Sequence, residues 1–66
     1  MDFRQNIKDL REGMEMSQSE LDYLSGLPQG TVMQIESGSP FYNTRDVDAI
    51  ADALDISLEE LVGSVR

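Results

Sequence analysis

The chain of 66 residues contains no cysteine and no histidine. These absences exclude disulfide bonds and the common zinc sites. No apolar run approaches the roughly 18 residues that a bilayer-spanning helix needs. The first residues, Met1 to Arg4, lack the charged and apolar regions of a signal peptide. We therefore expect a cytoplasmic protein that binds no metal ion.

Groups that could support catalysis are missing as well. The sequence contains no paired nucleophile and base, no metal-binding cluster and no glycine-rich phosphate loop. Its carboxylates lie at predicted helix caps and on outer helix faces, where solvated charge is the ordinary explanation. The sequence therefore predicts no enzymatic activity, no catalytic residue and no cofactor.

Basic residues are scarce, because five Lys and Arg stand against 13 Asp and Glu and give a net charge of −8. Phosphate neutralisation by Lys and Arg supplies most non-specific affinity for DNA, so this composition argues against a generic nucleic-acid binder. A chain of this length has room for one domain and buries only about 60% of its unfolded surface. We expect one marginally stable domain over residues 1–66.

Residues 17–38 predict two short helices joined by a tight turn. Ser17 and Glu20 form a capping box at the start of the first of these helices. Gly26 can take the left-handed conformation that commonly ends a helix. The inward face of this helix is predicted to carry Leu21 and Leu24.

The second of these helices is predicted to begin near Pro28, which suits a first helical turn, and to end at Gly38. Val32 and Ile35 form its inward pair. Its outer face carries no charge and consists of Gln29, Gly30, Met33, Gln34 and Ser37. Glutamine can pair with the N6/N7 edge of adenine in the major groove, and glycine permits close backbone approach. The alternative interpretation is that these glutamines are ordinary solvated surface.

Residues 2–15 predict the first helix of the chain, with Asp2 as its cap. Arg4, Lys8 and Arg11 recur along one strip of this helix, which we interpret as a solvated face rather than a dedicated site. The neighbouring strip is apolar and consists of Phe3, Ile7, Leu10 and Met14.

Two more helices are predicted towards the C-terminus. Asn43 caps a helix over residues 44–54, and Ser57 with Glu60 forms a capping box for a last short helix. The inward faces of these two helices carry Val47, Ile50, Ala51, Leu54, Leu58, Leu61 and Val62. Because no segment predicts a strand, we expect an all-α fold of five short helices around one core.

The segment from Ser39 to Asn43 has no helical periodicity and predicts a loop. Phe41 and Tyr42 are unusual for a solvated loop. Either they close over the core or they form an exposed contact with a protein partner. We favour core packing for one of them, because apolar side chains usually pack.

Three segments resemble the lambda-repressor-like helix-turn-helix domains, the Cro and phage-repressor class also called the xenobiotic-response-element family. They read IKDLR followed by SQSEL, then TVMQIESG, then IADALDISLEEL, and they occur in family-like order and spacing over residues 7–62. The resemblance implies a compact five-helix domain with its helix-turn-helix at about residues 17–38. It also implies binding of a double-stranded DNA operator by a homodimer.

The resemblance assigns roles to individual positions. Those that match DNA contacts are Gln18, Gln29, Gly30, Thr31, Met33 and Gln34. Asn43 and Arg45 are further candidates for DNA contact, judged from their own side chains. Arg11 and Glu36 match a structural ion pair, which would neutralise the acid on the recognition helix. The dimer contact is expected at Leu58, Val62 and Val65. Acidic residues crowd the last two helices, which in this family lie away from the groove or form the dimer contact.

Three departures from the family pattern bear on DNA binding. The loop after the recognition helix lacks its usual Arg and Lys, Asp22 replaces a small or neutral residue, and Pro28 replaces a common Ser or Thr cap. With few phosphate contacts left, we expect weak non-specific binding and a shallow dependence on salt.

The preferred hypothesis is a small sequence-specific transcriptional regulator, a repressor of Cro type. The alternative is an acidic protein-interaction module on the same fold, such as an antirepressor, an antitoxin-like partner or a DNA mimic. The alternative would use Phe41, Tyr42 and Met33 as its contact.

Overall fold

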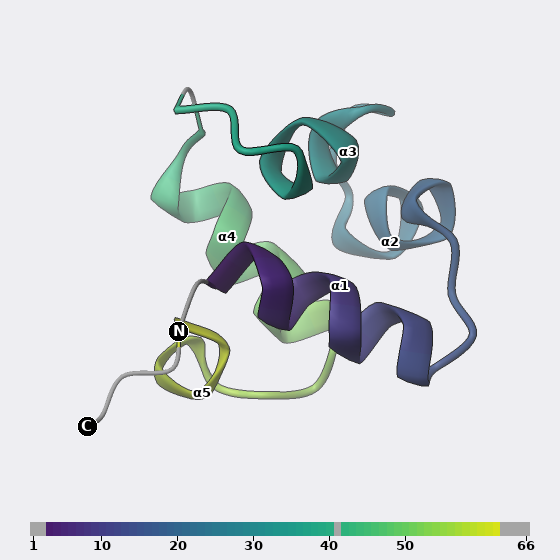
Figure 1. Cartoon of the computed structure of the whole chain (residues 1–66), viewed down its shortest axis with the longest axis vertical. Coiled ribbons are helices and arrows are strands. Elements are labelled where there is room, and N and C mark those ends of the chain that lie inside the picture. Colours follow the sequence, from purple (N-terminus) through teal and green to yellow (C-terminus); the bar gives the residue numbers. More distant parts are fainter. Residues whose placement is uncertain (1–2, 41, 63–66) are drawn as a thin grey trace.

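The computed structural model describes residues 3–40 and 42–62, and within these ranges it contains five helices and no strand (Figure 1). The helices are α1 (Phe3–Gly13), α2 (Gln18–Ser25), α3 (Thr31–Glu36), α4 (Thr44–Ala53) and α5 (Leu58–Val62). The predicted all-α fold of five short helices is therefore confirmed. None of these helices has the length and the apolar character that a membrane crossing requires.

The predicted caps explain where several helices begin and end. The Ser17 hydroxyl accepts from the Glu20 backbone N–H, and the Glu20 carboxylate accepts from the Ser17 N–H, which completes a capping box. Ser57 and Glu60 repeat this arrangement before α5. Gly26 ends α2 with a left-handed φ of 72°. These predictions are confirmed, whereas the predicted cap Asp2 lies outside the described residues.

The first helix is shorter than predicted, because α1 ends at Gly13 and not at Glu15. Glu15 takes a positive φ of 56°, which no helix interior allows. Met14 was predicted on the apolar stripe but is exposed, since it stands beyond the last helical residue.

One core cluster joins all five helices. Its fully buried members are Ile7, Leu21, Val32, Ile35, Val47, Ile50, Ala51, Leu54 and Leu61. The prediction that Leu24 faces inward was wrong, because 56% of this residue is exposed. Leu27, in the turn after α2, packs against the core. Leu27 in the turn thus makes the core contact that helical periodicity predicted for Leu24 in α2.

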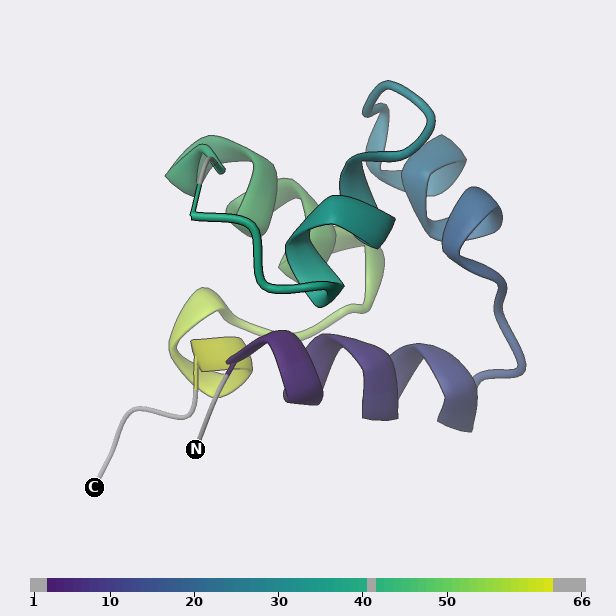
Figure 2. The same ribbon diagram turned by 45° about the horizontal axis from the view of Figure 1, so that its top comes forward.

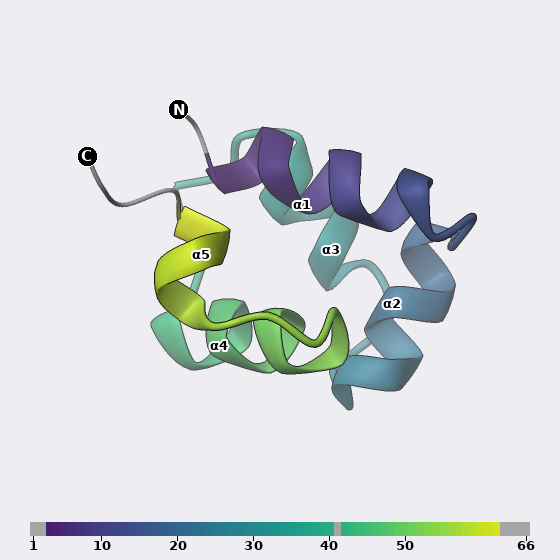
Figure 3. The ribbon, with the colours of Figure 1, turned by 90° about the horizontal axis from the view of Figure 1, so that it is seen from below.

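The packing of the helices places α3 at the surface. α3 packs against α1 and α2, while α5 packs against α1 and α4. Figures 2 and 3 show α5 beside the start of α1, with the turn between α2 and α3 on the other side of the molecule. α1 and α2 therefore support the inner side of α3 and leave its outer side open to solvent.

Candidate nucleic-acid interface

The outer surface of α3 is open and uncharged. Val32 and Ile35 are buried against the core, whereas Met33 is 54% exposed and Gln34 is exposed. Between Ser25 and Thr44 the sequence contains one charged residue, Glu36. This surface, made of Gln29, Gly30, Met33, Gln34 and Ser37, is called the α3 face below.

α3 begins three residues later than predicted, at Thr31 rather than at Pro28. Pro28 lies in the preceding turn, where its carbonyl accepts from both the Thr31 backbone N–H at 3.2 Å and the Thr31 hydroxyl at 2.7 Å. Gly30 stands at the N-cap with a φ of +101°. A side chain at that position would be strained, so the chain's own backbone conformation explains this glycine.

The cap of α3 comes from α2. Asp22 is only 1% exposed, and its two carboxylate oxygens accept from the backbone N–H groups of Gly30 at 2.8 Å and Val32 at 2.9 Å. These N–H groups belong to the first turn of α3, where no helical carbonyl is available to them. The negative charge also lies at the positive end of the helix dipole. Asp22 therefore fixes the position of α3 against α2.

Sequence reasoning missed this role, because it treated Asp22 as an added negative charge near DNA. The signal that could have identified it was the pairing of two departures from the family pattern. Pro28 replaces the usual Ser or Thr cap, and a carboxylate appears on the inner side of the preceding helix. The Asp22 side chain supplies the capping acceptor, so the two departures compensate each other.

Gln29 is tethered to the start of α2. Its amide oxygen accepts from the Ser19 hydroxyl, and its amide nitrogen donates to the Ser19 carbonyl oxygen at 3.2 Å. The Gln34 side chain, in contrast, makes no hydrogen bond with any residue that the structure describes. Of the two glutamines, Gln34 can therefore turn its amide towards a base without first breaking an internal contact.

Glu36, the acid of α3, is held inside the protein. Arg11 donates to the two carboxylate oxygens of Glu36 from Nε at 2.9 Å and Nη2 at 3.1 Å, and to the Met16 carbonyl from Nη1. Gln18 donates to the same carboxylate at 2.9 Å. The Arg11 and Glu36 side chains are 10% and 7% exposed.

Electrostatics reinforce this ion pair. The hydrogen bonds to Glu36 raise the pKa of Arg11, against the opposing effect of burial, so the guanidinium stays charged. Because a bidentate pair neutralises the carboxylate of Glu36, the α3 face carries no net charge. Gln18 is half-buried and supports this pair with its amide nitrogen.

Asn43 and Arg45 flank the start of α4. The Asn43 side chain accepts from the Arg45 backbone N–H at 3.0 Å, so Asn43 caps α4 as predicted. Both side chains are exposed. Their amide nitrogen and guanidinium can donate hydrogen bonds to an anionic group outside the protein.

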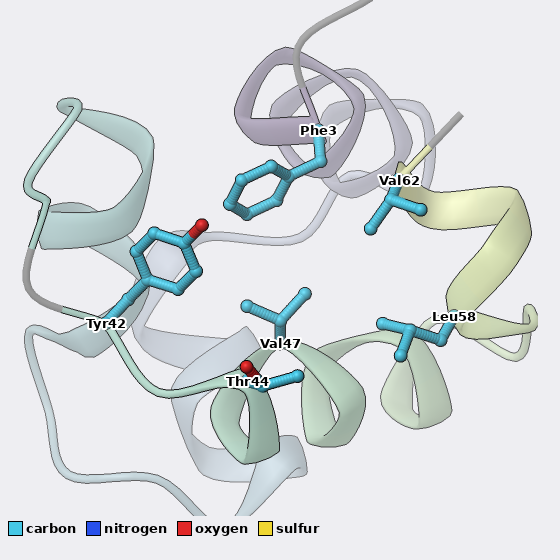
Figure 4. Close-up of a pocket in the computed structure, with 6 residues that line it drawn as sticks. All are labelled: Phe3, Tyr42, Thr44, Val47, Leu58 and Val62. Atoms are coloured by element: carbon cyan, nitrogen blue, oxygen red, sulfur yellow. The ribbon is translucent and has the colours of Figure 1, made fainter. Parts of the chain in front are cut away.

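The predicted dimer residues lie partly at a pocket of about 160 Å³ (Figure 4). Leu58 and Val62 line it from α5, and the other lining residues are Phe3, Tyr42, Thr44 and Val47. The prediction that Val62 faces inward was wrong, because this residue is exposed. Leu58 packs partly against the core. Val65, the third predicted dimer residue, lies outside the described ranges.

The two aromatic residues of the loop have different outcomes. Phe41 lies outside the described residues. Tyr42 is exposed at its outer side, and its ring centroid lies 5.3 Å from that of Phe3. Tyr42 therefore contacts the start of α1 but is not buried in the core.

Charge is distributed unevenly over the molecule. The exposed acids of α4, α5 and the turn between them are Asp48, Asp52, Asp55, Glu59 and Glu60. On the α3 side, Asp22 and Glu36 are both enclosed by donors. The net charge of −8 is therefore not a property of the α3 face.

Comparisons with known proteins agree with this geometry. A helix-turn-helix family model matches residues 7–61. Among solved structures, the chain is similar to the restriction-modification controller protein C.AhdI from Aeromonas hydrophila. The two share 36% sequence identity over 89% of each chain, with a TM-score of 0.82. No curated protein sequence matches the chain.

Proposed function

This chain belongs to the lambda-repressor-like helix-turn-helix family, and we propose that it is a sequence-specific DNA-binding regulator of transcription. The observation that carries the proposal is the α3 face, which is exposed, uncharged and rich in amides. Its position is fixed from behind by the Asp22 cap and by the Arg11–Glu36 pair. A rigid helix with such a face suits the major groove.

Base recognition is assigned to the exposed polar and apolar groups of this face. Gln34 offers both an amide donor and an acceptor, which match the N6/N7 edge of adenine. Met33 would contact a thymine methyl group, and Gly30 would let the backbone approach the groove. Gln29 reaches DNA from its tether on Ser19. Gln18 and Thr31 contact the adjoining backbone.

Phosphate contacts are few in this proposal. Asn43 and Arg45 supply an exposed amide and an exposed guanidinium. Because each neutralised phosphate adds about 0.9 to the slope of log affinity against log salt, few contacts imply a shallow slope. Specific base contacts then carry a larger share of the affinity than in a basic DNA-binding protein.

The proposed regulatory role follows the neighbouring structure, whose protein is a restriction-modification controller. We assign to this chain the control of transcription in the cytoplasm, by repression. A dimer bound at an operator within a promoter would exclude RNA polymerase from it. In a reporter strain, expression from such a promoter should fall when the chain is produced, and a rise would assign activation instead.

A homodimer would give the specificity that one small domain lacks. Two recognition helices would enter successive major grooves about 34 Å apart. The contact between protomers would be formed by Leu58 and Val62 of α5 together with Val65, which follows α5 in the sequence. Val62→Glu is expected to yield monomers in analytical ultracentrifugation, because it places a charge in an apolar contact. Glu59→Gln on the same helix is the control, and a Val62→Glu variant that stays dimeric would reject this interface.

The DNA-reading role is tested with Gln34→Ala. An operator is first selected from random duplexes with the wild-type chain. Loss of a bidentate contact costs about 1–3 kcal/mol at each half-site, so a dimer should lose at least about thirtyfold in specific affinity. Gln5→Ala on α1 removes an exposed amide elsewhere and should change little. Equal affinities of the Gln34→Ala and wild-type proteins would reject the assignment.

A second candidate function rests on the acidic side of the molecule. The exposed acids of α4 and α5 suit a protein-interaction module, with Phe41, Tyr42 and Met33 as a contact. Failure of the folded wild-type chain to select any duplex would favour this candidate over DNA binding.

A further inference from the structure

Arg4, near the start of α1, is held against two aromatic rings. Its guanidinium carbon lies 5.0 Å from the ring centroid of Phe3 and 5.4 Å from that of Tyr42. The two rings are tilted by 53° to each other. Distances below about 6 Å bring the cation within the attraction of the ring faces. Tyr42 thereby links the loop after α3 to α1.

A hydrogen bond places the same guanidinium at the end of α3. Arg4 Nη2 donates to the Ser39 carbonyl oxygen at 3.3 Å. The Ser39 backbone N–H in turn donates to the carbonyl oxygen of Gln34 at 3.1 Å. Arg4 is thus connected, through one residue of the loop, to the helix that carries the α3 face.

This position supplies a cation that the loop itself lacks. The segment from Ser39 to Asn43 contains no Lys or Arg. Arg4 lies far from it in the sequence, yet its guanidinium reaches the beginning of this segment. The interpretation of Arg4 as part of a merely solvated strip was therefore wrong, because its charged end contacts the loop and two rings.

The geometry of a recognition helix determines what lies beside such a cation. The N-terminal residues of the helix contact base edges in the major groove. Its C-terminal end and the loop that follows approach the rim of the groove, which is lined by phosphates. About half or more of protein–DNA hydrogen bonds go to these phosphates and the sugars, and Arg is a preferred donor.

We propose that Arg4 is a phosphate-binding residue and that Tyr42 positions it at the end of α3. The inference rests on the proposed DNA-binding function. Stacking engages the flat faces of a guanidinium, whereas its N–H donors point outward along its edge. The same group can therefore be held by Tyr42 and Phe3 and still donate to a phosphate oxygen. Lysine could supply the charge but not the stacked, planar arrangement.

The test is the salt dependence of binding to the selected operator, measured by fluorescence anisotropy. Arg4→Gln should lower the slope of log affinity against log salt by about 0.9 for each protomer, or about 1.8 for a dimer. The wild type should then lose roughly tenfold more affinity than the variant between 50 and 200 mM salt. Arg4→Lys should keep the wild-type slope. Asp52→Asn, a single charge change on α4, should also keep it.

The positioning role of Tyr42 has a separate readout. Tyr42→Leu removes the ring and leaves every charge in place, so affinity should fall several-fold while the slope stays unchanged. Tyr42→Phe retains the ring and should restore the affinity. Circular dichroism establishes that each variant is folded. If Arg4→Gln does not fold, the comparison of Tyr42→Leu with Tyr42→Phe decides the question.

The possible outcomes distinguish failure of the Arg4 phosphate contact from failure of the proposed DNA-binding function. A wild-type chain that binds no duplex specifically overturns the proposed function. A wild-type chain that binds its operator, together with an Arg4→Gln variant of the same slope, overturns only the phosphate contact. Equal affinities of Tyr42→Leu and Tyr42→Phe overturn the positioning by the ring.

Discussion

Asp22→Ala is expected to lower the free energy of unfolding by about 3–5 kcal/mol. Two backbone N–H groups at the start of α3, those of Gly30 and Val32, would lose the carboxylate that accepts from them, at a buried site for Val32 and a partly buried one for Gly30. A domain of this size has a total stability of roughly 3–10 kcal/mol. The variant should therefore be largely unfolded at 37 °C, or melt at least about 12 °C below the wild type.

Asp22→Asn separates the loss of the hydrogen bonds from the loss of the charge. Its amide oxygen can replace one carboxylate oxygen, but its amide nitrogen would face a second N–H donor. We expect an intermediate cost of about 2–3 kcal/mol by urea unfolding. Asp48→Asn, at an exposed site on α4, should change stability by less than about 0.5 kcal/mol. If Asp22→Ala were as mild as this control, the capping role would be rejected.

Arg11→Met is the second substitution with a large expected effect, about 3–5 kcal/mol of lost stability. It would leave the Glu36 carboxylate inside the protein with Gln18 as its remaining side-chain donor among residues 3–40 and 42–62. Thermal and urea unfolding would measure the loss. The raised pKa of Arg11 means that the pair persists as pH rises, until the folded-state pKa is passed at strongly alkaline pH.

The pair can be tested as a unit by a double-mutant cycle. Arg11→Met with Glu36→Leu removes both charges and should recover most of the lost stability, because no buried charge remains. If the two single substitutions were simply additive in the double variant, Arg11 and Glu36 would not be coupled. Lys8→Gln, at an exposed site on the same helix as Arg11, controls for the loss of one positive charge.

Local signals in the sequence were sufficient for most of the architecture. Ser17 with Glu20, and Ser57 with Glu60, satisfy the first N–H groups of the helices that they begin, so each predicts its own boundary. Gly26 supplies the left-handed residue that ends α2. These contacts span only a few residues, and their chemistry is therefore readable from spacing alone.

The start of α3 could not be predicted in this way. Its capping side chain, Asp22, belongs to α2, and helical periodicity within one segment cannot predict a contact between two helices. Pro28 suited a first helical turn, yet it stands in the turn before Thr31 because the cap acts later in the chain. The exposure of Leu24 has a similar origin, since Leu27 packs against the core from that turn.

The candidate site shows the same division between local and distant contacts. The outer positions of α3 follow from a period of about 100° per residue, which identified Met33 and Gln34 as surface residues. The tether between Gln29 and Ser19, and the approach of Arg4 to Ser39, join residues from different elements. Only the folded arrangement shows that one glutamine is engaged and the other available.

An acidic chain can present an uncharged α3 face because two of its carboxylates are enclosed by hydrogen-bond donors. Glu36 is paired with Arg11, and Asp22 accepts hydrogen bonds from two backbone N–H groups at the start of α3, so neither charge faces outward from α3. If the chain binds DNA as proposed, the exposed acids on α4 and α5 would repel DNA that approaches those helices instead of the α3 face. We expect this arrangement to weaken non-specific binding more than specific binding.

The most direct test is fluorescence anisotropy with the selected operator and a scrambled duplex, over 50 to 200 mM salt. We expect tight binding to the operator alone, with a slope of roughly −4, because Arg4 and Arg45 would provide about four phosphate contacts in a dimer. Equal binding to both duplexes, or no binding to either by the folded chain, would contradict sequence-specific DNA recognition through α3.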